Sequence, residues 1–124
     1  MANEVMRVLT FQVPALEDAD GVVDFEALEA MTIVGVSLCA TVFTGTPTGF
    51  TIDIQDDGSD VIAAIAADTA LTPGTWKSVH MGGEEDAVHI AAGSEVEIDL
   101  NLTGGSSPTA TFTVAIYYLA GLQG

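Results

Sequence analysis

Hydrophobic and polar residues alternate with a period of two along much of the chain, which is typical of β-strands that bury one face. The clearest case is Ser94–Leu102, where apolar residues (Val96, Ile98, Leu100, Leu102) alternate with polar ones (Glu95, Glu97, Asp99, Asn101). Thr51–Asp56 and Thr109–Leu119 repeat the pattern, and the second has the β-branched and aromatic content that suits a pleated surface. All three segments are therefore predicted to be strands.

Two further segments extend this set. Thr32–Phe43 is apolar on both faces near Ile33–Val36, so we expect a central strand or one whose second face is covered by another subunit. Val5–Val13 is predicted as the first strand, closed by Pro14.

Glycine and proline interrupt the chain often enough to keep every predicted strand short. The turn signals are Gly45–Gly49, Asp57-Gly58, Pro73-Gly74, Gly82-Gly83, Gly93 and Gly104–Pro108. Short strands at this spacing predict an all-β antiparallel sandwich or barrel of roughly eight strands. Neither a repeat nor a linker is visible, so we expect one domain spanning residues 1–124.

Two segments are ambiguous. Asp24–Met31 has helix-forming composition and could make one or two helical turns. Ser59–Asp68 could begin a helix with Ser59 as its N-cap, or form a strand. We favour the strand because Asp57-Gly58 is a good hairpin turn and strands are expected on both sides.

The charge is as informative as the pattern. Two Lys and Arg residues stand against 18 Asp and Glu, giving a net charge of −16, yet 48% of the residues are hydrophobic. The carboxylates must mostly remain in water, where they keep the protein soluble. Nucleic acids and anionic membranes are excluded as partners because no basic patch can form. Adaptation to a saline environment is an alternative reason for the acid excess.

A chain of 124 residues has limited interior for so many apolar side chains. We therefore expect leftover apolar surface that contacts other subunits, although exposed alanines on a monomer are an alternative. The start of the chain lacks a secretory signal and no apolar run could span a bilayer, so synthesis in the cytoplasm is expected. Cys39, alone in an apolar run, is expected to be a buried thiol.

The acidic turns raise the question of calcium. Asp53, Asp57 and Gly58 fit positions of a helix–loop–helix calcium loop, but Ala64 stands where the bidentate glutamate is needed. A polar strand end that runs into a turn is the simpler interpretation. A looser site formed by Asp56, Asp57 and Asp60 remains an alternative.

Other chemistry has little support in the sequence. His80 and His89 flank an acidic Gly-rich segment, but their spacing matches no defined metal motif. No serine lies in a Gly-x-Ser-x-Gly elbow, and no glycine-rich stretch has the Lys-Ser/Thr of a phosphate loop. We therefore expect neither catalysis nor a metal or cofactor.

An aromatic residue beside a rare cation marks the best candidate contact. Trp76 and Lys77, with His80 and Met81 nearby, suit a contact with an acidic neighbouring subunit. Trp76 could instead be a half-buried anchor, or, with a tyrosine, a small stacking platform for sugars.

Several stretches resemble the small jelly-roll or sandwich proteins that decorate the heads of tailed bacteriophages. The stretches are Thr32–Ser37, Asp53–Gly58, Gly74–Trp76, Gly93–Asp99 and Thr111–Leu119. The resemblance implies a jelly-roll-like sandwich and a non-enzymatic protein that binds the outside of the capsid shell, often as a trimer, and cements it.

The sequence and this resemblance together give two main hypotheses, beside a third one, a small metal-dependent enzyme around His80 and His89. The first is a trimeric decoration protein on the capsid exterior, with the major capsid protein lattice as its partner. The alternative is a carbohydrate- or cell-surface-binding sandwich module of a fibre or adhesin.

Overall fold

The computed structural model describes residues 6–17, 19–66, 73–80 and 88–120 of the chain. These residues form strands and turns and no helix, hence none that could cross a membrane. The strands are β1 (Met6–Leu16), β2 (Ala19–Glu26), β3 (Met31–Thr44), β4 (Gly49–Asp56), β5 (Ser59–Ala66), β6 (Trp76–His80), β7 (Val88–Ile90), β8 (Glu95–Thr103) and β9 (Thr109–Ala120). The prediction of an all-β protein is confirmed.

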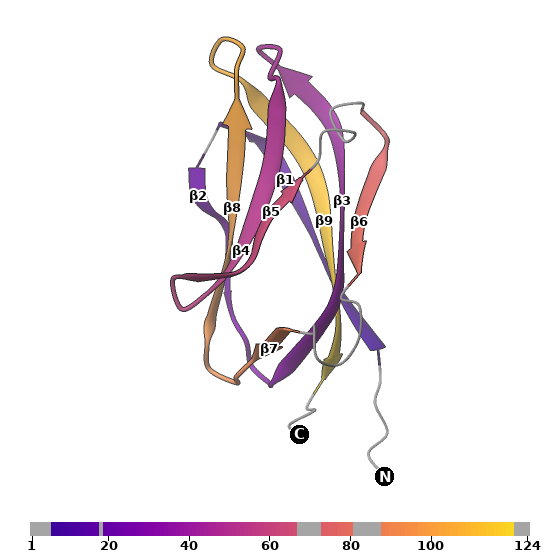
Figure 1. Ribbon diagram of the computed structural model, residues 1–124, viewed down its shortest axis with the longest axis vertical. Helices are drawn as coiled ribbons and strands as arrows, with labels where there is room; N and C mark the ends of the chain where they lie inside the picture. Colours follow the sequence, from indigo (N-terminus) through magenta and orange to yellow (C-terminus); the bar gives the residue numbers. More distant parts are fainter. Residues whose placement is uncertain (1–5, 18, 67–72, 81–87, 121–124) are drawn as a thin grey trace.

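The strands make two antiparallel sheets that pack face to face (Figure 1). Sheet A has the order β1-β9-β3-β6, with the short β7 also paired to β3, and sheet B has the order β2-β8-β4-β5. When β7 is left out, the first strand pairs with the last (β1 with β9) and the second with the second-last (β2 with β8). The third pairs with the third-last (β3 with β6), and the innermost pair is the β4–β5 hairpin. This is the connectivity of a jelly roll, which confirms the predicted antiparallel sandwich.

The core lies between the sheets and is built by the alternation seen in the sequence. The apolar residues of β4, β8 and β9 point inward, among them Ile52, Ile98 and Ile116, and all three are fully buried. Phe50 packs edge-to-face on both Phe43 and Phe112, with ring centroids 5.4 Å apart in each pair. Such aromatic contacts join the two sheets at one point of the core.

The ambiguous segment Asp24–Met31 does not form the helical turns that its composition allowed. Its first three residues belong to β2, and the rest is a turn that leads into β3. Phe25 packs its ring on Phe11 of β1 at 5.3 Å, while its neighbours Asp24 and Glu26 point outward. A strand buries Phe25 against the opposite sheet, and this tertiary contact outweighs a weak helical preference.

One strand boundary differs from the prediction, and one ambiguous assignment is settled. β1 continues past Pro14 to Leu16, because β1 is an edge strand and the missing N–H of proline faces no partner. The strand assignment of the ambiguous segment that starts at Ser59 is confirmed as β5.

At one end of the sandwich the β3–β4 and β8–β9 loops lie side by side (Figure 1). Thr48 N–H donates to Thr103 O at 2.8 Å, and Ser106 N–H donates to Gly45 O at 2.9 Å. Gly45 has a φ of +74°, and a Cβ there would collide with the backbone of Ser106 and Pro108. Only glycine allows the two loops to approach this closely.

Candidate functional site

The outer face of sheet B carries a continuous set of carboxylates, which we call the acidic face. Its members are Asp24, Glu26, Asp53, Asp60, Glu95, Glu97 and Asp99. Strand pairing places acids directly opposite one another, as in Asp24 with Glu97 and Glu26 with Glu95. Such like-charge pairs destabilise a sheet, so this face lowers the stability of the isolated fold.

Uncharged donors offset part of that repulsion. Asp99 is 5% exposed, and its Oδ1 accepts a hydrogen bond of 2.8 Å from Gly21 N–H, in an irregular part of β2. Asn101 donates to Asp53 at 3.0 Å. Gln55 donates to Asp60 at 2.9 Å. The face is therefore held by amides and backbone rather than by cations.

One carboxyl on this face titrates abnormally. The pKa of Glu95 is raised above its ordinary value, mainly because it shares a hydrogen bond with the Asp24 carboxyl. The negative charges of Asp24 and Glu97 raise this pKa further. Proton uptake by Glu95 thus relieves repulsion within the acidic face.

Two groups of acids have ligand atoms within 4.8 Å of one another and could hold a cation: Asp24, Glu95 and Glu97, and Asp53, Asp60 and Asp99. The looser calcium site considered as an alternative, with Asp56, Asp57 and Asp60, is not such a group, although all three residues are described. Asp56 Oδ1 is instead buried without a hydrogen bond at the end of β4. Acidic groups of this kind are common on protein surfaces, and they do not by themselves assign a metal site.

The outer face of sheet A is different, and we call it the neutral face. It presents Met6, Val8, Thr10, Gln12, Val34, Ser37, Cys39, Thr41, Val42, Trp76, Ser78, Thr111, Thr113, Ala115, Tyr117 and Leu119. In the part of the chain that the structure describes, no Asp, Glu, Lys or Arg belongs to this set. The face is apolar with a scatter of hydroxyl groups.

Exposed large hydrophobic side chains gather on the neutral face. Met6 and Trp76 are each 55% exposed, and Val42 and Val8 are 51% and 48% exposed. The remaining described example, Leu28, lies in the turn between β2 and β3. Four large apolar side chains on one face are more than the scattered exposure of an ordinary surface, and they indicate a contact region.

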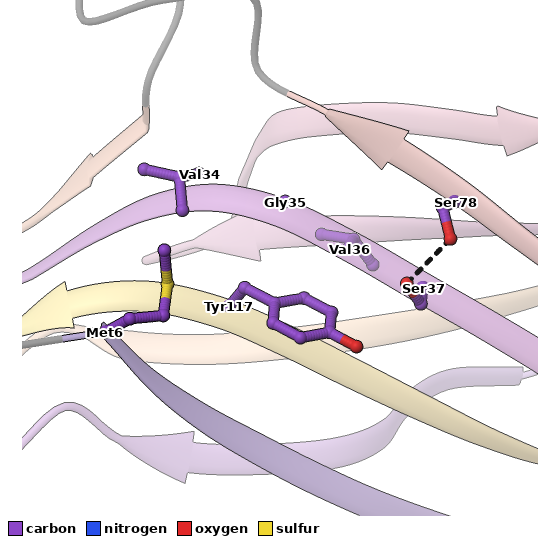
Figure 2. A pocket seen from close by; sticks show the side chains of 7 residues that line it. All are labelled: Met6, Val34, Gly35, Val36, Ser37, Ser78 and Tyr117. Carbon is purple, nitrogen blue, oxygen red and sulfur yellow. Dashed lines mark hydrogen bonds between the residues drawn. The ribbon is translucent and has the colours of Figure 1, made fainter.

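The neutral face is also hollowed. A groove of about 390 Å³ runs between β1, β9, β3 and β6, where Met6, Val34 and Tyr117 form much of its lining (Figure 2). Ser37 and Ser78 share a hydrogen bond of 2.8 Å across its floor (Figure 2). A second groove of about 410 Å³, lined by residues that include Gln12, Pro14 and Thr113, opens on the same face.

The contact predicted from the sequence falls partly on this face. Trp76 lies on β6 opposite Cys39 and is 55% exposed, so both the subunit contact and the half-buried anchor stay predictions. Lys77 is the next residue of β6 and is half-buried, and the backbone of His80 pairs with Gly35. Met81 lies outside the described residues. That these four residues form the contact remains a prediction.

The other singled-out residues occupy ordinary positions. His89 on β7 is exposed and shares a hydrogen bond of 3.1 Å with Thr32 Oγ1. Cys39 is 5% exposed and is a free thiol, as predicted. Arg7 lies 3.8 Å from Glu29 in an ion pair that is about half exposed, which contributes little to stability.

Sequence reasoning missed most of the neutral face, although a signal was present. The outward positions of β8 are Glu95, Glu97 and Asp99, whereas those of β9 are threonine, alanine and tyrosine. A difference of this size between two amphipathic strands indicates that their outer faces meet different surroundings.

Comparison with known proteins adds partial likenesses to solved structures. No protein-family model matches the chain. No curated protein matches it either. A chain in the "acidic stable capsid structure" of Helicobacter pylori bacteriophage KHP30 is 11% identical, with a TM-score of 0.48, and the match covers 98% of this chain and 90% of that one. A chain of the infectious bursal disease virus VP2 subviral particle is 20% identical, with a TM-score of 0.41 over 94% of this chain and 33% of that one. This chain spans about a third of the VP2 chain, and because both TM-scores are below 0.5 we draw no function from either likeness.

Proposed function

We propose that this chain is a non-enzymatic virion structural protein that binds the outer surface of a phage capsid and stabilises it. One observation carries the proposal: the two outer faces of the sandwich have opposite chemistry. The neutral face exposes Met6, Val8, Val42 and Trp76, and a protein contact would remove them from water. The acidic face has to remain solvated, since two cations cannot neutralise its carboxylates.

The grooves support a structural role over a catalytic one. Among the side chains that the structure describes, neither groove on the neutral face has a His, Cys, Asp, Glu, Lys or Arg in its lining. General acid–base chemistry needs such a group within hydrogen-bond reach of a substrate. The Ser37 hydroxyl is bonded to Ser78 rather than to a base that could activate it.

The fold is compatible with this role but does not decide it. Jelly rolls occur both in viral capsid proteins and in lectin domains, so the function has to be inferred from surfaces. In the proposed arrangement copies of the chain form the decoration unit on the capsid exterior, after synthesis in the host cytoplasm. The major capsid protein lattice is the partner.

The test is to assemble shells from the major capsid protein of the same genome, with and without this chain. We expect the chain to co-sediment with the shells and to raise the temperature at which they release their contents. A chain that stays in the supernatant at a tenfold excess over binding sites would refute the proposal.

A second candidate is a carbohydrate-binding module, favoured by the exposed Trp76 indole, which could stack on a sugar ring. A glycan array separates the two candidates. Specific sugar binding that Trp76→Ala removes, with the oligomer unchanged, would favour the module over the decoration protein.

A further inference from the structure

We infer that the neutral face is the contact between copies of this chain. The inference deepens the proposed function and rests on it for the premise that the protein assembles. It commits the face to a second copy rather than to the shell, and it leaves shell contact to the edges and loop ends of the sandwich, so that the acidic face stays solvated.

The net charge of the chain favours a second copy as the partner that covers the neutral face. A second copy also has a net charge of −16, so most ways of bringing two copies together bring carboxylates together. Contact between two neutral faces brings none together among the described residues, and it points both acidic faces away from the contact. A cationic partner would gain no charge attraction on the neutral face, because no carboxylate among the described residues belongs to it.

Distance makes the remaining repulsion tolerable at ordinary salt. Packed sheets lie about 10 Å apart, so two sandwiches in face-to-face contact place their acidic faces roughly 30 Å apart. The Debye length is about 8 Å at 0.15 M salt and about 30 Å at 0.01 M. The acidic faces are therefore screened from each other at physiological salt and repel each other at low salt.

The size of the face is adequate. Four strands about 4.8 Å apart and about ten residues long cover roughly 600 Å², or about 1,200 Å² for two partners. This area is at the lower end of the range for specific protein interfaces. Exposed side chains such as Met6, Val8 and Trp76 project from one copy and can enter the two grooves of the other copy.

Charge substitution tests the contact with a matched control. Val8→Glu and Val8→Lys each place a charge on the neutral face, whereas Leu28→Glu and Leu28→Lys make the same changes at an exposed apolar residue outside it. If the face is the contact, both Val8 variants raise the dissociation constant at least tenfold in sedimentation at 0.15 M salt. Both Leu28 variants leave it within threefold. If net charge alone controlled assembly, the two lysine variants would strengthen it.

Two more measurements keep the inference falsifiable if a Val8 variant folds poorly. Thr10→Glu introduces the same charge at an exposed polar position on the same face, and it is expected to weaken assembly as Val8→Glu does. Trp76 is the sole tryptophan of the chain and is 55% exposed, so its emission should shift to shorter wavelength as the wild-type protein is concentrated.

A comparison of self-association at two salt concentrations completes the test. We expect the dissociation constant of the wild type to be at least tenfold higher in 0.01 M than in 0.15 M salt. A monomer at about 100 µM in both buffers overturns the inference, as does an oligomer that is insensitive to the Val8 and Thr10 variants. A monomer that still stabilises shells overturns this contact and leaves the proposed function standing. An oligomer that does not bind shells supports this contact and overturns the proposed function.

Discussion

Asp53 on β4 and Asp99 on β8 lie directly opposite each other, so that two carboxylates face across one strand pair of sheet B. Asp99 is nearly buried and accepts a hydrogen bond from Gly21 N–H. The acidic face is thus packed more closely than a set of freely solvated side chains. The charge repulsion within the acidic face and the neutrality of the opposite face lead to three predictions. One more concerns the paired loops at the end of the sandwich.

The first concerns the Asp53–Asp99 pair. Asp99→Asn keeps an oxygen for Gly21 N–H and removes the like charge opposite Asp53, so we expect the free energy of unfolding to rise by about 0.5–1 kcal/mol in low salt. Asp99→Ala also removes the repulsion but leaves Gly21 N–H without its acceptor, so we expect a loss of about 1–2 kcal/mol. Urea unfolding at 0.02 M and 0.5 M salt measures both. Equal effects for the two variants would show that the Gly21 hydrogen bond does not matter.

The second concerns pH. The pKa of Glu95 is raised in the folded state by its hydrogen bond with Asp24 and by the neighbouring charges. The folded chain therefore binds this proton more tightly than the unfolded chain. The contribution of Glu95 to stability increases as the pH falls through its folded-state pKa towards 4.5, the ordinary pKa of a glutamate. The destabilisation by its negative charge returns as the pH rises.

The measurement is a carboxyl-detected NMR titration of Glu95. Asp24→Asn should move the pKa of Glu95 back towards its ordinary value, because it removes the first cause of the shift. Asp60→Asn, a matched change in the other carboxylate group, serves as the control and should leave Glu95 unaffected. An unchanged Glu95 titration in Asp24→Asn would disprove the assignment.

The third concerns the paired loops at the end of the sandwich. Gly45 and Gly58 both have positive φ, but a Cβ at Gly45 would lie 2.7 Å from Pro108 Cα, whereas one at Gly58 meets nothing within 4 Å. Gly58→Ala should cost about 1 kcal/mol of backbone strain alone. Gly45→Ala should cost about 3 kcal/mol, because the β8–β9 loop must also move. Similar losses in thermal unfolding would mean that the loops are not held together.

The fourth concerns Trp76. Since it is exposed on the edge strand β6, Trp76→Ala should change the free energy of unfolding of the monomer by less than about 1 kcal/mol. The same variant should weaken self-association at least tenfold if the indole is an anchor of the neutral face. Trp76→Phe, which keeps an aromatic ring, should weaken self-association much less. Sedimentation of the three proteins decides this, and an unchanged oligomer in Trp76→Ala argues for another role of the indole.

The fold was largely predictable because its main signal is local. Alternation in β4, β8 and β9 identified the strands and their buried residues, and Asp57-Gly58 identified the β4–β5 hairpin. The sequence left Asp24–Met31 ambiguous, because its composition also allowed helical turns. Phe25 is partly buried against Phe11, which lies in a different sheet, and no local pattern carries that information.

The candidate surface was less predictable, since it depends on which strands become neighbours. Trp76 was noticed in the sequence because it is large and rare. Met6, Val8 and Val42 drew no attention individually, and they form one face with Trp76 only because β1, β9, β3 and β6 share a sheet.

The sequence alone therefore determined most of the strands, the inward and outward sides of those that alternate clearly, and an acid excess that must remain in water. Strand pairing decided the rest. β8 and β9 follow each other along the chain but enter different sheets, so the acidic outward residues of one and the neutral outward residues of the other cover opposite sides of the molecule. A side-chain period of two is fixed within each strand, whereas the partners of a strand are fixed by contacts between residues far apart in the chain.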